Sequence, residues 1–297
     1  MQTGMPANPE LKAGFLGLGA MGAPMAHHLH LAGFLRAVYN RSPERAKQFQ
    51  QDHPDILIAE SPQALASLVD VVFLCVSADA DVLEQMKAMS PSLRPGHIVI
   101  DCSTVSRMTA IEASNLVTAL GAQFFDAPVT GGVEGARNGA LSVMLGGEQI
   151  GLSKILPLLA TFSSRQTHMG AVGSGQAAKA VNQVMCAGIN EAVTEALAFG
   201  VGLGLDIEKV MDAIRGGAAG NWFLDKRGSS MTQGSFNPGF KVELHQKDLR
   251  ICLEMAEAIH QDLAITRTTS NHYSMLIEAG HGNEDISSLY RIKRPSA

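Results

Sequence analysis

One lysine within a long apolar stretch is the residue best suited to acid–base chemistry in this sequence. Lys179 lies in the segment Gly173–Gln183 and is the only basic residue between Ala171 and Glu208. A helix that is apolar on nearly every face is expected to be buried. Burial lowers the pKa of an ammonium group, which suits a lysine to proton transfer near neutral pH. Composition alone also allows a lysine whose ammonium group reaches the surface.

Asn182 follows this lysine by three residues. Residues three apart on a helix lie on one face. We therefore expect Lys179 and Asn182 to converge on one small polar molecule, with the lysine as proton donor or acceptor.

A glycine-rich turn near the N-terminus is the second feature that could carry chemistry. Gly17, Gly19 and Gly22 form a G-x-G-x-x-G sequence after a short apolar run and before a helical pattern. In a dinucleotide site, such glycines permit a tight turn, a close approach to the pyrophosphate and close packing of helix on strand. The helix that follows offers N–H groups and a positive dipole end to the phosphates. The other residues of this predicted cofactor turn are Leu18, Ala20 and Met21.

The turn Asn40-Arg41-Ser42 stands about 20 residues past the glycines, where a dinucleotide site contacts the adenine ribose. An acidic residue there would bind the 2′-hydroxyl of NAD. Asn40 carries no charge to repel a 2′-phosphate, and Arg41 can pair with one. The sequence therefore favours NADP(H), with NAD(H) still possible. A solvated turn that caps the next helix is a compatible alternative.

Composition limits the class of protein. With 297 residues, 46% of them hydrophobic and 17% charged, the chain is expected to be globular, with two domains. A net charge of −5 without a basic cluster gives no reason to propose nucleic acid or a membrane as partner. The four cysteines are far apart, which predicts free thiols in a reducing cytoplasm. No metal-ligand spacing occurs, so no metal is expected. Residues 1–11 are polar, which predicts a flexible extension without a signal peptide.

The order of apolar runs predicts an α/β fold: an N-terminal Rossmann domain with a doubly wound sheet over residues 12–170, then an all-α domain over residues 171–297. A long core helix that begins near residue 175 is expected to join them. The predicted strands span residues 14–17, 35–39, 56–58, 71–76, 97–101, 123–129, 142–145 and 166–169. The predicted helices of the second half span residues 175–204, 207–215, 221–230, 241–261 and 267–279.

Three further motifs supply polar groups. Ser103 and Thr104 follow a predicted strand and would present hydroxyls at the carboxyl edge of the sheet. The Thr130-Gly131-Gly132 turn can form an anion-binding nest for a substrate carboxylate. Lys247 lies in an amphipathic helix as a second candidate basic group. A helix cap, a tight turn and a surface ion pair are the corresponding structural alternatives.

Together, in this order and spacing, the motifs resemble the β-hydroxyacid dehydrogenase family over nearly the whole chain. The resemblance implies that Lys179 is the catalytic acid/base and that Asn182 binds substrate. It also implies a substrate site that includes Ser103, Thr130, Gly131 and Gly132, and further cofactor contacts at Val76, Ser77, Thr104 and Lys247. Thr130 stands where serine is usual, and Ser77 stands where many relatives have proline.

The implied reaction is reversible hydride transfer between NADP(H) and a small carboxylate-bearing semialdehyde or 3-hydroxy acid. The expected substrate is 2-hydroxy-3-oxopropionate, with 3-hydroxyisobutyrate, succinic semialdehyde and glyoxylate as alternatives. Imine reduction is a rival chemistry on the same fold, and a non-catalytic NADP-binding sensor or scaffold is an alternative of a different class. Because the second half is rich in apolar helices, a homodimer or homotetramer is expected.

Overall fold

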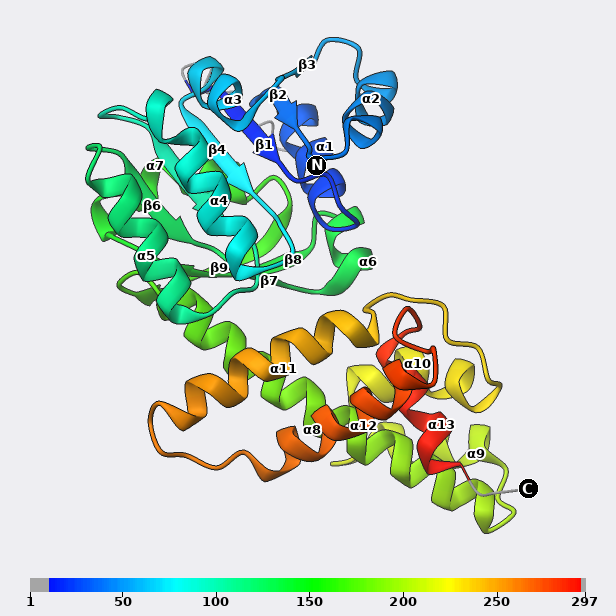
Figure 1. The fold of residues 1–297 in the computed structure, drawn as a ribbon. Helices are drawn as coiled ribbons and strands as arrows, with labels where there is room; N and C mark the ends of the chain where they lie inside the picture. Colours follow the sequence, from blue (N-terminus) through cyan, green and yellow to red (C-terminus); the bar gives the residue numbers. More distant parts are fainter. Residues whose placement is uncertain (1–10, 295–297) are drawn as a thin grey trace. The chain divides into compact units, whose positions relative to one another are not determined.

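The computed structural model describes residues 11–294, which form two compact units (Figure 1). The division falls between Lys179 and Ala180, inside the long helix α8 (Ser174–Gly202). Apart from Leu11, the predicted extension over residues 1–11 lies outside the described residues.

The N-terminal unit is built on one mainly parallel sheet. Its strands are β1 (Ala13–Leu16), β2 (Leu35–Tyr39), β3 (Leu57–Ile58), β4 (Val71–Leu74), β5 (Ile98–Asp101), β6 (Gln123–Asp126), β7 (Val129–Thr130), β8 (Leu141–Gly146) and β9 (Ser163–Gly170). Their order is β3-β2-β1-β4-β5-β6-β8-β7, and β9 pairs with β8. Strands β1 to β6 pair in parallel, and β8 is antiparallel to both β6 and β7. The sheet is therefore a doubly wound Rossmann sheet whose strand order reverses between β1 and β4.

Helices pack against this sheet through two apolar clusters. They are α1 (Gly22–Leu31), α2 (Pro43–Asp52), α3 (Pro62–Leu68), α4 (Asp79–Met89), α5 (Arg107–Thr118), α6 (Gly132–Arg137) and α7 (Leu152–Leu159). Phe15 belongs to one cluster and its neighbour Leu16 to the other, because successive strand side chains point to opposite faces. The Phe15 ring stacks on that of Phe73, with centroids 5.9 Å apart. Both faces of the sheet are thus covered, as a parallel sheet requires.

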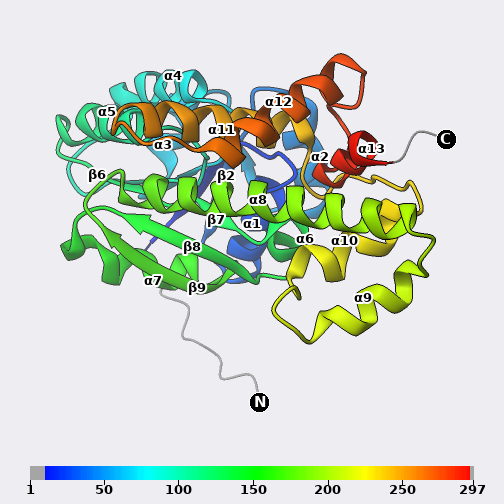
Figure 2. The same cartoon turned by 90° about the horizontal axis from the view of Figure 1, so that it is seen from below.

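The second unit is helical in its described part (Figure 2). After the remainder of α8 it contains α9 (Ile207–Arg215), α10 (Trp222–Thr232), α11 (Val242–Glu257), α12 (Ala264–Glu278) and α13 (Tyr290–Lys293). Asp206 and Asn221 cap α9 and α10 through side-chain oxygens that accept backbone N–H groups. Helices α11 and α12 lie side by side, and Leu249 and Tyr273 from this pair are fully buried in the unit's core.

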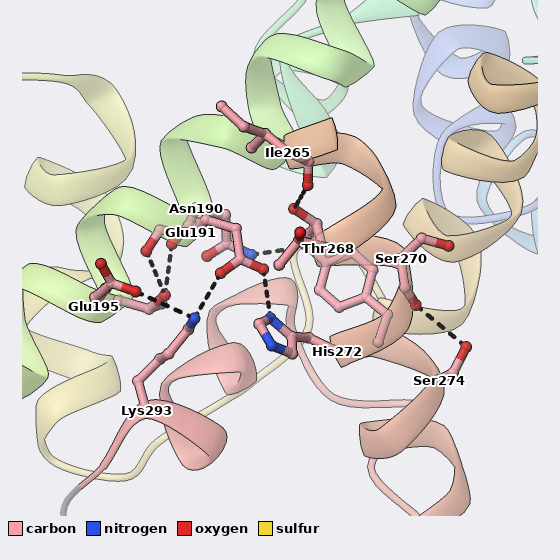
Figure 3. Close-up of polar contacts among 12 residues, drawn as sticks. Asn190, Glu191, Glu195, Ile265, Thr268, Ser270, His272, Ser274 and Lys293 are labelled. Carbon is pink, nitrogen blue, oxygen red and sulfur yellow. Dashed lines mark hydrogen bonds and ion pairs between the residues drawn. The ribbon is translucent and has the colours of Figure 1, made fainter. Parts of the chain in front are cut away.

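Charged and polar side chains contact one another in this unit (Figure 3). Glu191 of α8 accepts a hydrogen bond from Nδ1 of His272 at 2.8 Å and pairs with Nζ of Lys293 at 2.9 Å. Nearby, Asn190 donates from Nδ2 to the Tyr273 hydroxyl at 2.8 Å. These contacts tie α8 to α12 and α13.

Among the described helices, α8 is the one long and apolar enough to cross a membrane by length and composition. A core helix passes the same test. Since α8 carries the buried polar side chains of Lys179, Gln183, Asn190 and Glu191, we describe it as a core helix.

The predicted strands and long helices are present, with shifted ends. The predicted strand over residues 123–129 is wrong in one respect, because it is two short strands, β6 and β7, with Ala127 and Pro128 between them. Proline has no N–H to donate to a ladder, which favours an interruption there. The predicted helix over residues 241–261 ends at Glu257, and His260 beyond it has a left-handed backbone (φ 56°).

Candidate active site

The glycine turn after β1 is shaped by close backbone packing. Gly17 has φ +98°, and a Cβ atom on it would collide with the carbonyl oxygen of Cys75. A Cβ on Gly22 would collide with the carbonyl oxygen of Gly17. The position of Gly19 is open, since the nearest atom to its built Cβ is a guanidinium nitrogen of Arg45 at 3.8 Å. The turn thus needs glycine at two positions for packing and leaves the third free for the approach of a ligand.

The N-terminus of α1, which follows this turn, is available to an anion. Its N-cap residue, Met21, makes no side-chain capping bond, and the first turn holds no acidic residue. Ala20 beside it is exposed. The first N–H groups of a helix lack intrahelical partners, and the dipole is positive at that end. These residues therefore fit the pyrophosphate of a dinucleotide.

Asn40 ties the glycine turn to the turn after β2. Its Oδ1 accepts the backbone N–H of Leu18 at 2.8 Å, and its Nδ2 donates to the carbonyl oxygen of Ser42 at 2.9 Å. Arg41 extends into solvent with its side chain 77% exposed, and it pairs with Asp81 of α4 at 3.1 Å. Asn40 is thus a clamp within the turn, while the Arg41 guanidinium remains accessible.

The loops after β4 and β5 are joined through Ser103. Its Oγ accepts the backbone N–H of Val76 at 2.9 Å, and its own N–H donates to Oδ1 of Asp101 at 2.9 Å. Ser103 is only 2% exposed, whereas Thr104 is half-buried and Ser77 is exposed. The Ser103 hydroxyl hydrogen can still be donated, because the bond to Val76 uses an oxygen lone pair.

Two carboxyl groups are buried behind these loops. Asp101 and Asp126 end the adjacent strands β5 and β6 and are register partners. Burial raises the pKa of Asp101 to about 6, against the lowering effect of its bonds from Ser103. Burial also raises the pKa of Asp126, although backbone N–H groups of the Gly173–Gln176 turn oppose the shift. Oδ2 of Asp101 has no hydrogen-bond partner among the described residues.

Asp126 and Gln176 fix the first turn of α8. The Asp126 carboxylate accepts the backbone N–H groups of Gly173 and Gln176, each at 2.8 Å. The Gln176 side chain donates from Nε2 to the carbonyl oxygen of Ser103 at 2.8 Å and accepts the N–H of Val105 at Oε1, at 3.2 Å. The start of α8 is therefore bonded to the loop that carries Ser103.

Lys179 lies one turn further along α8 and is buried, with 7% of its surface exposed. Asn182, half-buried, begins a polar chain in the second unit. Its Nδ2 donates to Oε1 of Gln183 at 2.7 Å, and Gln183 donates from Nε2 to Oδ2 of Asp248 at 2.6 Å. The other Asp248 oxygen pairs with Nζ of Lys247 at 3.0 Å. The structure thus links two residues predicted for substrate and cofactor.

The Thr130-Gly131-Gly132 turn lies between β7 and α6. Thr130 pairs with Ser142 of β8, and both glycines have positive φ, +128° and +65°. A β-branched residue would be strained at either glycine. Both glycines are exposed, so their N–H groups stay candidates for a carboxylate ligand.

Comparison with known proteins identifies the family. The family model for the NAD binding domain of 6-phosphogluconate dehydrogenase matches residues 12–173. The family model for the NAD-binding region of NADP-dependent 3-hydroxyisobutyrate dehydrogenase matches residues 173–293. The chain belongs to the β-hydroxyacid dehydrogenase family. It is 33% identical to 2-hydroxy-3-oxopropionate reductase of Escherichia coli over 94% of this chain and 96% of that protein. Human mitochondrial 3-hydroxyisobutyrate dehydrogenase is 29% identical over 95% of this chain and 86% of its own length.

A solved structure supports the same family assignment. 3-Hydroxyisobutyrate dehydrogenase of Mycobacterium tuberculosis, determined with L-serine, superposes with a TM-score of 0.87 at 30% identity, over 96% of this chain and 99% of that one. As a β-hydroxyacid dehydrogenase, the protein is an NAD(P)-dependent oxidoreductase that acts on CH–OH groups. The predicted family, Rossmann fold and enzyme class are confirmed.

Three residues that contact the predicted site of this β-hydroxyacid dehydrogenase were not predicted from the sequence. Arg45 lies beside Gly19, Asp81 pairs with Arg41, and Gln176 joins α8 to the Ser103 loop. Arg45 lies in the first turn of α2, four residues after Arg41, and this closeness in sequence could have indicated a second guanidinium at this corner. The only signal for Gln176 was its polarity within an apolar segment.

The described part of the chain holds no group of three or more His, Cys, Asp or Glu side chains that could bind a metal ion. No two of the four cysteines, which all lie in the described part of the chain, form a disulfide. Cys102 and Cys252 are buried, and Cys75 and Cys186 are half-buried. Burial raises the pKa of the Cys102 thiol well above its ordinary value, so this thiol is unreactive near neutral pH.

Proposed function

We propose that the protein is an NADPH-dependent reductase of 2-hydroxy-3-oxopropionate that also catalyses the reverse oxidation. The observation that carries the proposal is the buried Lys179 on α8, one turn beyond the point where that helix is bonded to the Ser103 loop. A buried lysine next to fixed polar groups suits general acid–base catalysis.

In this proposal each residue has one task. Lys179 donates a proton to the alkoxide oxygen that develops during reduction, and it takes the hydroxyl proton during oxidation. Asn182 and Ser103 orient the substrate by hydrogen bonds, and the N–H groups of Gly131 and Gly132 hold its carboxylate. When bound, the nicotinamide supplies or accepts the hydride.

The preference for NADP(H) rests on the corner after β2. Asn40 brings no carboxylate that would bind a ribose 2′-hydroxyl, and the guanidinium groups of Arg41 and Arg45 are both exposed there. Guanidinium groups bind phosphate through charge-assisted hydrogen bonds.

The choice of substrate rests on similarity. Identity is 33% with the bacterial 2-hydroxy-3-oxopropionate reductase and 29% with the human 3-hydroxyisobutyrate dehydrogenase. Oxidation of 3-hydroxyisobutyrate is the second candidate activity, supported by the structural match to the mycobacterial 3-hydroxyisobutyrate dehydrogenase. We also propose a cytoplasmic location, supported by four cysteines that form no disulfide with one another.

Initial rates of NADPH and NADH oxidation test this function with the semialdehydes of tartronate, methylmalonate and succinate and with glyoxylate. We expect the highest kcat/KM for NADPH with tartronate semialdehyde, which is 2-hydroxy-3-oxopropionate. A higher kcat/KM with methylmalonate semialdehyde would favour the second candidate, and a preference for NADH would overturn the cofactor assignment.

A further inference from the structure

We propose that Gln176 is a positioning residue that sets the register of Lys179 against the loop of Ser103 and Thr104. The inference rests on the proposed function, since it assigns Lys179 the proton transfer. It adds a residue that acts through its neighbours and does not itself react.

The Gln176 side chain is held at both ends of its carboxamide. It is 1% exposed, its Nε2 donates to the Ser103 carbonyl oxygen at 2.8 Å, and its Oε1 accepts the Val105 N–H at 3.2 Å. A flipped carboxamide would set an N–H group against an N–H group and an oxygen against an oxygen. The side chain therefore fixes both the distance and the rotation of the helix relative to the loop.

The bonds of Gln176 also fix the position of Lys179, because Lys179 follows Gln176 by three residues on α8. Residues at this spacing share a helix face, so a rotation or slide of the first turn moves both side chains together. A misplacement of about 1 Å at a reacting group costs on the order of 10²-fold in rate. The two hydrogen bonds are thus placed to control turnover.

Contacts other than those of the Gln176 side chain hold the first turn of α8 in the fold. The cap of α8 is made by the Asp126 carboxylate, which accepts backbone N–H groups, including that of Gln176 itself. A Cβ atom on Gly175 would collide with the carbonyl oxygen of Met144, so the first turn is also packed closely against β8. Loss of the Gln176 side chain leaves both contacts in place and removes only the bonds to the loop.

Gln176→Met, which keeps the size and removes both hydrogen bonds, tests the inference. A matched control is Gln85→Met, because Gln85 is a buried glutamine of α4 in the same unit, 8% exposed. We expect kcat of Gln176→Met to fall on the order of 10²-fold, with the Kd for NADPH unchanged. The control should keep the wild-type kcat. Equal losses in the two variants, or a loss explained by weaker NADPH binding, would overturn the inference.

Gln176→Glu gives a second test through its pH profile. A protonated carboxyl group can donate to the Ser103 carbonyl and accept from Val105, as the carboxamide does, whereas a carboxylate cannot donate. The ratio of the variant's kcat to that of the wild type should therefore rise as the pH falls. A ratio independent of pH would contradict the hydrogen-bonding role.

Hydrogen exchange measured by mass spectrometry supplies a readout that needs no substrate. The segment 102–107 should exchange faster in Gln176→Met than in the wild type, and Gln85→Met should leave it unchanged. Unaltered exchange in Gln176→Met would overturn the inference even if kcat fell. If the wild type instead oxidised NADPH with none of the semialdehydes, the proposed function would fail, while the exchange result would still report on the contact.

Discussion

Two features of Lys179 support a role in proton transfer: its burial and the fixed position of the helix turn before it. The residue is buried, with 7% of its surface exposed, and the preceding helix turn is anchored by the Asp126 carboxylate. A lysine that merely covered apolar surface would need neither feature. A catalytic lysine and a lysine that only covers apolar surface predict different effects of substitution on turnover and on thermal stability.

Lys179→Ala should fold and bind NADPH, because the glycine turn at Gly17–Gly22 is the expected phosphate site and lies on a different element. Its kcat should fall about 10²–10⁴-fold, the usual effect of losing a general acid. Lys179→Arg should not restore the rate, since a guanidinium group does not release its proton near neutral pH. Steady-state kinetics and a thermal melt distinguish the cases. Near wild-type turnover in Lys179→Arg would exclude the lysine as proton donor.

Arg41 should determine which cofactor binds. Arg41→Ala is expected to weaken NADPH binding by about 1–3 kcal/mol, the contribution of a charge-assisted hydrogen bond, and to leave NADH binding unchanged. Asp81→Asn should act in the opposite direction, because Asp81 pairs with Arg41 at 3.1 Å and would repel a 2′-phosphate. Fluorescence titrations with both cofactors measure these effects, with Arg36→Ala, at an exposed position in β2, as control. Equal loss of both cofactors in Arg41→Ala would contradict the prediction.

At the scale of elements, a histidine cluster joins α1 to the end of α2. Nδ1 of His27 lies 3.1 Å from Nε2 of His53, and the ring of His30 stacks on that of His53 with centroids 4.4 Å apart. His30 in turn bonds to Asp55 through Nε2 at 3.0 Å. Because only one proton fits between two nitrogens at hydrogen-bond distance, protonation of both His27 and His53 would break their contact.

The cluster should make stability depend on pH. Burial, and next the charge of His53, lowers the pKa of His27 from 6.5, and burial and His30 lower that of His53. His28 adds to the shift of His27, while Asp52 opposes it. The unfolded state therefore binds more protons below about pH 6.5, so this contribution to stability is lost as the pH falls from that value through the lower pKa values of the folded state.

His27→Gln should accordingly show a smaller drop in Tm between about pH 7.5 and about pH 6 than the wild type. His260→Asn, at an exposed position, is the control and should keep the wild-type difference. Asp101 acts in the opposite sense: its pKa is raised from 3.8 to about 6 in the folded state, so its contribution to stability is lost as the pH rises through about 6. An undiminished drop in His27→Gln would refute the assignment to this pair.

Within the helical unit, the buried Glu191 offers a matched pair of variants. The side chain of Glu191 is 11% exposed and that of Glu195 is 74% exposed, yet both pair with Lys293 (Figure 3). Glu191→Gln should lower the free energy of unfolding by about 1–3 kcal/mol, because it leaves the Lys293 side chain, which is 15% exposed, with a weaker partner. Glu195→Gln should cost less than about 1 kcal/mol. Chemical denaturation measures both, and equal losses would show that burial does not decide the contribution.

At the scale of the whole molecule, apolar side chains on α8 reach solvent in the single chain. Val181 is 67% exposed, Met185 is 61% exposed and Phe199 is 68% exposed. Large apolar side chains exposed along one helix are typical of surfaces that pack against another chain. We therefore propose a homodimer or homotetramer.

Light scattering at micromolar concentration should report a mass at least twice the 31.4 kDa of the chain. Phe199→Glu should shift the population toward the monomer, because a carboxylate in an apolar interface loses its hydration. A monomeric wild type would contradict the assembly.

The sequence predicted the elements better than the contacts between them. The turn at Gly17, Gly19 and Gly22 could be predicted because the spacing of these glycines is a local property of the chain. The contact between Gln176 and Ser103 spans 73 residues, and nothing local indicates it. The same holds for the pair of Arg41 and Asp81, 40 residues apart, which exists only once the fold brings the start of α4 to the turn after β2.

The bonds made by Gln176 also bear on how such enzymes can be recombined. The two family matches meet at residue 173, which makes this position the obvious junction for joining halves of two relatives. A junction there keeps α8 whole but takes Asp126 and Ser103 from one parent and Gln176 from the other. Chimeras that inherit residues 173–179 together with the first half would keep native partners around the lysine, whatever the origin of the helices that follow.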